Sequence, residues 1–251
     1  MSAGPDATIL ILQHQPDDGP GNIQAWLDHH AMAHSVVDVA TEQLPDAGHY
    51  RALAILGSSR SVYEDEPWIL AEHEFVRCCI AAGTPVLGIC FGAQLLAHVL
   101  GGKVRRMSRP ELGWYDIAGE PPYGGTWFVW HGDEISPPPG GTVLATSSRC
   151  VHAFATAKHL GVQYHPELTA ALIDYWMASP RRRELITDCG GDVRQILAAT
   201  TVLEPAAVAA AGRLYDAFFA QQHHRNQPVS LTPGGPTAKG SDTRHTHARV
   251  G

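Results

Sequence analysis

The stretch TPVLGICFGAQLLAHVLGG, residues 84–102, constrains the fold of this chain more than any other. It begins with the short apolar run 85–89, which is typical of a central parallel strand covered on both faces. It ends with leucines and a valine at helical spacing, followed by a glycine pair that stops a helix. The stretch therefore predicts a buried strand, a sharp turn that holds Cys90, and a helix.

Cys90 is the candidate nucleophile. Gly88 and Gly92 flank it at the two positions where a strand-to-helix elbow has no room for side chains, as in the G-x-S-x-G elbow with sulfur in place of oxygen. A helix N-terminus favours the thiolate, and its free backbone N–H groups can hold an oxyanion. A lone cysteine before a helix is more often a buried structural residue. The glycine context and a second motif favour the nucleophile.

The second motif is GVQYHPE, residues 161–167. Its alternation of apolar and polar residues predicts a strand that projects His165 and Glu167 to the same side. In that arrangement the imidazole takes the Cys90 proton and later gives it to the leaving amine, while the carboxylate fixes the tautomer and stabilises the charged ring. Taken alone, His-Pro-Glu fits a surface turn with a solvated carboxylate equally well.

Together, GICFGAQLLA and GVQYHPE resemble the class I glutamine amidotransferase family of the Cys-His-Glu triad type, over about residues 8–178. Three further segments resemble its stand-alone branch, which is similar to the amidotransferase domain of GMP synthetase: LGSSRSVYEDEPWI, ELGWYDI and WHGDEISPPPGGTVLATS. The resemblance implies a flavodoxin-like α/β fold and hydrolysis of a γ-glutamyl amide.

The resemblance also implies a role for particular residues of this chain. Cys90 is the nucleophile, His165 the general base and acid, and Glu167 the residue that orients the imidazole. The remaining assignments are oxyanion donors at Gly57, Ser58 and Phe91, and substrate contacts at Gln94, Trp130 and His131, with Asp133 in the same loop. The plain alternatives are an ordinary loop after a strand, a polar helix residue and a capped turn.

Two positions depart from the family pattern and leave the shape of the substrate pocket open. His152 stands before Ala-Phe where many relatives have glutamine, and Ala93 stands where some have histidine. Substrate specificity is expected in the loops 58–66, 103–126 and 147–153.

The fold class predicted from the patterns is α/β, with a central, mostly parallel sheet flanked by helices and extended by antiparallel strands. The expected parallel part has strands at 8–12, 35–39, 51–56 and 85–89 and helices at 23–30 and 68–82. The β-rich part has strands at 103–107, 112–118, 127–131, 142–146, 152–157 and 160–164. C-terminal helices are expected at 168–178 and 204–224.

This pattern divides the chain into four parts. They are a short N-terminal extension (1–7), the amidotransferase domain (8–178), a C-terminal helical extension (179–225) and a disordered tail rich in Pro, Gly, Ser, Thr and His (226–251). The run Arg181–Arg183 is interpreted as a solvated helix face or first turn rather than a ligand clamp. Histidines 223, 224, 245 and 247 are too irregularly spaced to indicate a metal site.

Composition excludes several classes of protein. The formal net charge of −7 and the lack of a broad basic run argue against nucleic-acid binding. No leader pattern and no run of apolar residues long enough for a span is visible, so we expect no membrane association and a cytoplasmic location. The five cysteines are odd in number and lack a C-x-x-C pair or metal-ligand spacing, which predicts neither disulfides nor a metal.

Three functions are compatible with the motifs. The leading one is a glutaminase-type amidotransferase that needs no cofactor and passes ammonia to a separate synthetase. The second is a γ-glutamyl peptidase or hydrolase, whose leaving group is a larger amine and which has no synthetase partner. The third is a non-catalytic regulatory or binding subunit, against which an intact triad argues.

Overall fold

The computed structural model of the protein describes residues 8–48 and 50–223. The expected N-terminal extension (1–7) and the expected tail (226–251) lie outside the described residues.

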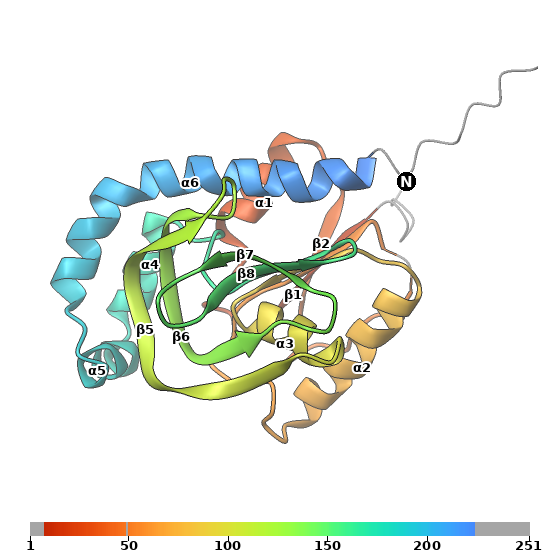
Figure 1. The fold of residues 1–251 in the computed structure, drawn as a ribbon, viewed down its shortest axis with the longest axis horizontal. Coiled ribbons are helices and arrows are strands. Elements are labelled where there is room, and N and C mark those ends of the chain that lie inside the picture. The colour runs from red at the N-terminus through yellow and green to blue at the C-terminus, as the bar shows by residue number, and fades with distance from the viewer. Residues whose placement is uncertain (1–7, 49, 224–251) are drawn as a thin grey trace, which may run out of the picture.

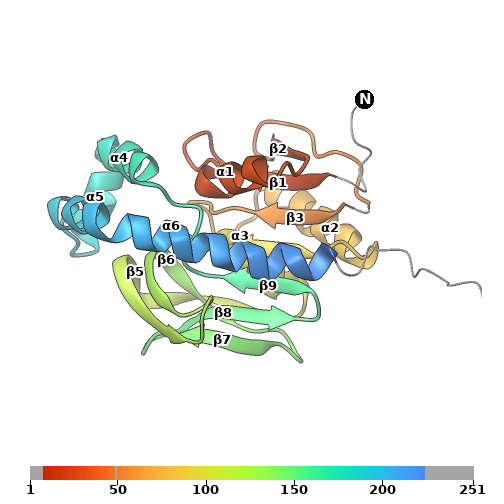
Figure 2. The same cartoon turned by 90° about the horizontal axis from the view of Figure 1, so that it is seen from above.

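One sheet of nine strands organises the fold, in the order β2-β1-β3-β4-β9-β8-β7-β5-β6 (Figures 1 and 2). The first five strands in this order pair in parallel, and from β9 onward each neighbour is antiparallel. The strands are β1 (Ile9–Gln13), β2 (His34–Asp38), β3 (Ala52–Ile55), β4 (Val86–Ile89), β5 (Lys103–Gly119), β6 (Gly125–Ser136), β7 (Thr142–Thr146), β8 (Val151–Thr156) and β9 (His159–Val162). The predicted α/β class, parallel with antiparallel additions, is confirmed.

Helices cover the parallel half of the sheet on both faces, which is why its strands are continuous apolar runs. Successive residues of β1 alternate between two cores: Ile9 packs with α1 (Gly21–His29) and the C-terminal half of α6 (Val193–His223). Leu10 packs on the opposite face with α2 (Pro67–Ala81) and α3 (Phe91–Val99). Figure 2 shows α6 running along one side of the sheet.

A third apolar cluster joins the C-terminal helices to β6. It includes Phe128 of β6, Trp176 of α4 (Ala170–Ala178), Ile186 of α5 (Pro180–Asp188) and Ile196 of α6. Thr169 and Ser179 cap α4 and α5, since their side chains accept hydrogen bonds from backbone N–H groups of the first helical turn. These helices therefore bring the segment 176–189 to one end of the antiparallel strands.

Some predicted elements have other bounds in the structure. The strand predicted at 160–164 ends at Val162, because the backbone N–H groups of Gln163 and His165 bond to His152 and Phe128 rather than continuing the β4 ladder. The segments predicted at 103–107 and 112–118 form the single strand β5, whose register against β6 shifts between Arg106 and Glu111.

The last helix is longer than predicted, because α6 begins at Val193 and contains Pro205 within it. By length and composition alone, its segment Val193–Phe219 is long and apolar enough to cross a membrane. In this fold the same helix packs against α1, α4, β5 and β6. Packing onto the domain accounts for the apolar residues in its C-terminal half, where Leu214 and Phe219 are fully or almost fully buried.

Candidate active site

Cys90 lies at a strained elbow between β4 and α3. Its φ of 52° and ψ of −107° are unusual for a residue with a side chain. A Cβ on Gly88 would lie 2.3 Å from the carbonyl oxygen of Gly92, and one on Gly92 would lie 2.1 Å from that of Ile55. The Cys90 N–H donates to the Val162 carbonyl at 2.8 Å. Both predicted glycine positions are therefore required sterically, and the elbow is tied to β9.

His165 and Glu167 meet directly beyond the end of β9. The imidazole Nδ1 lies 2.7 Å from Glu167 Oε1, and both side chains are buried. The two residues reach each other from an irregular segment rather than from an extended strand, because the His165 N–H is held by the Phe128 carbonyl at 2.9 Å. The juxtaposition predicted from GVQYHPE is present, although the strand alternation used to predict it is not.

The charged form of His165 is stabilised by its neighbours. Burial by itself lowers the pKa of His165, but the Glu167 carboxylate and the Cys90 sulfur together raise that pKa well above its usual value. Nε2 is buried and, apart from its interaction with Cys90, has no partner among the described residues. The imidazole is thus fixed by Glu167 on one side and turned toward the sulfur on the other.

The loop after β3 closes over the same two side chains. A Cβ on Gly57 would lie 3.1 Å from His165 Cε1 and 3.8 Å from Cys90 Cβ. Phe91 opens α3, where helical N–H groups have no intrahelical acceptor. The predicted donors Gly57, Ser58 and Phe91 therefore surround the elbow.

A cavity of about 260 Å³ opens at the elbow and contains most of the residues predicted for substrate binding. Cys90 Sγ lies 3.7 Å from the carbonyl oxygen of Trp130. Gln94, which lines the cavity, donates to Gln163 at 3.3 Å. The predicted residues that line the cavity are Gly57, Ser58, Cys90, Gln94, Trp130, His131, Asp133, His165 and Glu167.

Comparison with known proteins agrees with this geometry. The profile of the family Glutamine amidotransferase class-I matches residues 28–177, which is more than half of the chain. The chain belongs to this family. A glutamine amidotransferase from Thermotoga maritima, 23% identical, superposes with a TM-score of 0.77 over 85% of this chain and 98% of its own. At that identity the likeness concerns the fold, which is the amidotransferase fold expected from the motifs.

Two relatives with named activities match about half of the chain. A glutamine-hydrolysing GMP synthase from Thermomicrobium roseum is 40% identical over 133 residues, 47% of this chain and 23% of that protein. A γ-glutamyl-L-1-hydroxyisopropylamide hydrolase from a Pseudomonas species is 33% identical over 144 residues, 49% of this chain and 48% of that protein. Both matches span less than half of the relative.

Sequence patterns did not identify His14, whose side chain contacts the loop after β3 that borders the elbow. His14 follows β1, is fully enclosed, and its Nδ1 lies 2.8 Å from the Gly57 carbonyl oxygen. Its Nε2 lies 3.0 and 3.1 Å from the two oxygens of Glu72 in α2. Burial lowers the pKa of His14, but Glu72 outweighs burial and the pKa is raised. In the sequence, Glu72 lies on the apolar face of the predicted helix, between Ile69 and Val76, and this was the available signal of a buried carboxylate. No spacing in the sequence links Glu72 to His14.

The interpretation of Arg181–Arg183 as a solvated face is wrong for Arg182. Its Nη2 lies 2.7 Å from Asp17 and 2.8 Å from Asp18, and its guanidinium lies 4.9 Å from the Trp176 ring centre. Arg182, Asp18 and Trp176 all line the cavity, together with Leu185 and Cys189. One wall of the cavity therefore comes from α4 and α5, whereas no residue of the loop 147–153 is among its lining residues.

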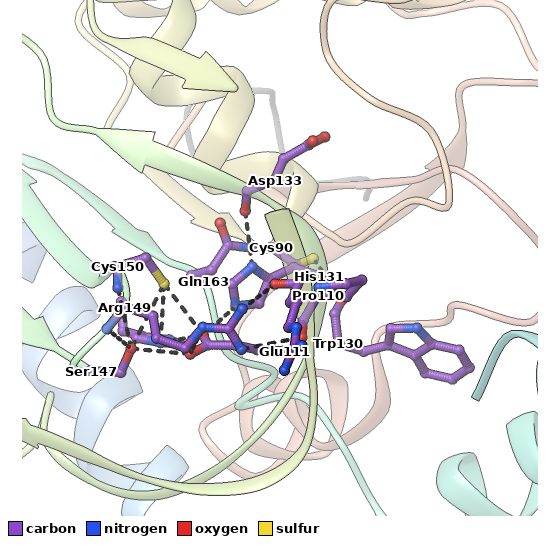
Figure 3. Close-up of polar contacts among 12 residues, drawn as sticks. Cys90, Pro110, Glu111, Trp130, His131, Asp133, Ser147, Arg149, Cys150 and Gln163 are labelled. Carbon is purple, nitrogen blue, oxygen red and sulfur yellow. Dashed lines mark hydrogen bonds and ion pairs between the residues drawn. The ribbon is translucent and has the colours of Figure 1, made fainter. Parts of the chain in front are cut away.

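Behind the cavity, His131 belongs to a buried polar cluster on β5, β6 and β8 (Figure 3). Glu111 Oε2 lies 3.1 Å from His131 Nε2 and 2.9 Å from His152 Nε2. Burial and the Glu111 carboxylate raise the pKa of the Cys150 thiol to about 12. His152, one of the two positions that depart from the family pattern, thus belongs to this cluster.

Proposed function

We propose that this amidotransferase hydrolyses the γ-amide of glutamine through a γ-glutamyl thioester on Cys90. The observation that carries the proposal is the 2.7 Å contact that holds the His165 imidazole against Glu167, next to a cysteine at a strained elbow. A structural cysteine needs neither the strain nor an oriented imidazole.

In the first half-reaction the Cys90 thiolate attacks the γ-carbonyl carbon, and the carbonyl electron pair moves to oxygen as the C–S bond forms. Collapse of this oxyanion breaks the C–N bond, while His165 Nε2–H donates its proton to the departing nitrogen. Glu167 accepts a hydrogen bond from Nδ1–H and holds the ring in place, so that loss of the Nε2 proton leaves the neutral tautomer protonated on Nδ1. The products of this step are ammonia and the thioester.

In the second half-reaction His165 accepts a proton from water as the water oxygen attacks the thioester carbon. Collapse breaks the C–S bond and releases glutamate, which restores the Cys90 thiolate and the imidazolium. The oxyanion of both steps is assigned to the backbone N–H groups of Ser58 and Phe91, with Gly57 leaving the space that a side chain would fill.

One observation favours a second candidate, hydrolysis of an N-substituted γ-glutamyl amide. Besides the triad, Trp130, Trp176 and Arg182 line the cavity, and the Arg182 guanidinium lies over both indole rings. An ammonia leaving group does not require a lining of this size. The γ-glutamyl amide hydrolase from Pseudomonas is a relative of similar identity. The two candidates share the triad and differ in the leaving amine.

The partner differs between the candidates as well. The GMP synthase relative supports a separate ammonia-accepting synthetase for the glutaminase, whereas the hydrolase needs none. A cytoplasmic location, where thiols stay reduced, belongs to the same proposal.

The test compares glutamate release from glutamine with release from γ-glutamyl amides of neutral and cationic amines, in the wild type and in Cys90→Ala. The proposal predicts release that falls at least about 10³-fold in Cys90→Ala, by analogy with other triads. Cys78→Ser, which changes an exposed thiol, is the matched control and retains the wild-type rate. Glutamate release that persists in Cys90→Ala contradicts the assignment of the nucleophile. Absence of Cys90-dependent release from every amide supports a non-catalytic subunit instead.

A further inference from the structure

Four side chains with metal-binding atoms converge behind the substrate cavity: Glu111, His131, Cys150 and His152. Figure 3 labels the first three of them. Their ligand atoms all lie within 4.8 Å of one another, and three of the four residues are buried. Of these residues, only His131 lines the cavity. The triad described above uses none of them, so the cluster requires its own explanation.

The separations between these atoms approach those of a tetrahedral zinc site. Glu111 Oε2 lies 2.9 Å from His152 Nε2 and 3.1 Å from His131 Nε2. Cys150 Sγ lies 3.3 Å from Glu111 Oε2 and 3.4 Å from His152 Nε2. Zinc bonds of 2.0–2.3 Å at tetrahedral angles place such ligand atoms about 3.3–3.6 Å apart. These four separations need to widen by a few tenths of an ångström. The two between His131 and the pair Cys150 and His152 lie within 4.8 Å and need to close by at most about 1.5 Å to admit the ion.

Hydrogen bonding within the cluster leaves His131 unsatisfied. Its Nδ1 lies 2.9 Å from the backbone carbonyl oxygen of Asp133, an acceptor, so Nδ1 carries the proton in the neutral ring. Nε2 then presents a lone pair to the Glu111 carboxylate, and this buried atom makes no hydrogen bond with a described residue. Two acceptors that face each other at 3.1 Å repel, whereas a cation between them satisfies both.

Glu111 is arranged to leave one oxygen for a cation. Ser147 donates a hydrogen bond to Oε1 at 3.2 Å, and Arg149 Nε lies 4.0 Å from the same oxygen. The other oxygen, Oε2, faces His131, His152 and Cys150 together. In metal sites a residue outside the ligand set commonly hydrogen-bonds one oxygen of a ligating carboxylate, while the other oxygen faces the metal. Glu111 has this arrangement.

We propose that Glu111, His131, Cys150 and His152 bind a zinc ion that holds β5, β6 and the start of β8 together behind the substrate cavity. One sulfur, two imidazole nitrogens and one carboxylate oxygen form a donor set that suits zinc. Binding releases the Cys150 thiol proton, and the thiolate and the Glu111 carboxylate balance the charge of the ion. All four positions around the ion are filled by protein, so its role is structural.

Metal analysis of the purified full-length protein, after expression with zinc and removal of loosely bound ions, tests the proposal. The wild type is expected to retain roughly one zinc ion per chain. Cys150→Ser and His152→Gln each remove a ligand, and retained zinc should fall at least about tenfold in either variant. Cys78→Ser is the matched control for loss of an exposed thiol and should retain zinc.

Two further variants exclude other zinc-binding sites on this chain. Cys90→Ser removes the thiol beside His165, and a variant with histidines 223, 224, 245 and 247 changed to glutamine removes the C-terminal histidines. Both should retain zinc. Loss of zinc in either variant, or full retention in Cys150→Ser, overturns the assignment.

Spectroscopy and stability measure binding independently of activity. Cobalt substituted into the wild type should give a thiolate-to-cobalt absorption band that Cys90→Ser keeps. Zinc at about a hundredfold excess over its Kd should raise the Tm of the metal-free wild type by roughly 5 °C or more. Wild-type protein that holds no zinc, gives no such band and shows no Tm shift contradicts the proposal. The cluster would then be a hydrogen-bonded polar core.

Discussion

The Nδ1 of His14 lies 2.8 Å from the carbonyl oxygen of Gly57, so a buried histidine fixes the peptide that borders the nucleophile. In a planar trans peptide the carbonyl and the following N–H point in opposite directions. A Gly57 carbonyl held toward His14 therefore fixes the direction of the Ser58 N–H, which points away from His14. Both ring nitrogens of His14 face acceptor oxygens, those of Gly57 and Glu72, and Glu72 raises the pKa of His14, which favours the ring form that donates from both nitrogens. His14 is thus a positioning residue for the oxyanion donor.

Replacing His14 with phenylalanine tests this role. The ring packing with Phe91 and Trp68 is kept, but the hydrogen bond to Gly57 is lost. We expect kcat to fall about 10²-fold with KM nearly unchanged, because the oxyanion donor is misplaced only in the transition state. The double variant His14→Phe/Glu72→Leu removes the unpaired buried carboxylate and should fold while keeping the low kcat. An unchanged kcat in a folded variant contradicts the role.

A methyl group at Gly57 should disturb the triad directly. The added Cβ would lie 3.1 Å from His165 Cε1, so the imidazole must shift by a few tenths of an ångström. We expect Gly57→Ala to lower kcat/KM at least about tenfold. The matched control is Gly212→Ala in α6, where a Cβ meets nothing within 4 Å. That change should leave turnover intact and stabilise the fold by about 0.5–1 kcal/mol.

The pH dependence of turnover should reflect the raised pKa of His165. The imidazolium that protonates the leaving nitrogen is held by Glu167 and Cys90, so kcat/KM should decline on the alkaline side with an apparent pKa well above 6.5. Removing the Glu167 charge lowers the His165 pKa. Glu167→Gln should therefore lower the apparent pKa of the alkaline limb by about one unit or more. If the apparent pKa of the alkaline limb is the same in the wild type and in Glu167→Gln, a group other than His165 controls this limb.

Stability should follow the same protonation. Because the folded pKa of His165 is raised above its unfolded value, the charged pair contributes stability below pH of about 6.5. This contribution is lost as the pH rises through the folded pKa. Thermal unfolding of the wild type and of His165→Gln across this window should show the difference between their Tm values shrinking toward alkaline pH.

Arg182 should govern which leaving amines the cavity accepts. Its guanidinium neutralises Asp17 and Asp18 at the cavity wall, and Arg182→Met keeps an apolar stem against Trp176 while exposing the Asp18 carboxylate. We expect the ratio of kcat/KM for cationic over neutral leaving amines to rise about tenfold. Arg181→Met, at an exposed neighbour, is the control and should leave the ratio unchanged.

Local motifs were sufficient to predict the elbow and the triad, because strand, glycine, cysteine and helix lie within 84–102 and His165 lies two residues from Glu167. Contacts that depend on sheet order and register were not predictable in the same way. Glu111 and His131 are cross-strand neighbours only after the β5 register shifts, and His152 reaches them from β8. These two histidines and Glu111 span 41 positions without a metal-ligand spacing, which is why the sequence predicted no metal.

The cavity wall formed by α4 and α5 was missed for a related reason. Arginines at the start of a helix are usually solvated, and the sequence around 181–183 has no signal that sets Arg182 apart from its neighbours. Its position follows from the capped turn at Ser179 and from packing of Trp176 and Ile186 on β6. Burial of these apolar residues fixes the direction in which the guanidinium points.

Covalent labelling tests the central claim most directly. A glutamine analogue with a chloroketone in place of the γ-amide is incubated with the wild-type protein, and the modified residue is located by peptide mass spectrometry. The account predicts a single adduct on Cys90, prevented by excess glutamine and much slower in His165→Ala. A first adduct on another of the five cysteines, above all Cys189 at the cavity wall, with Cys90 unmodified, contradicts it.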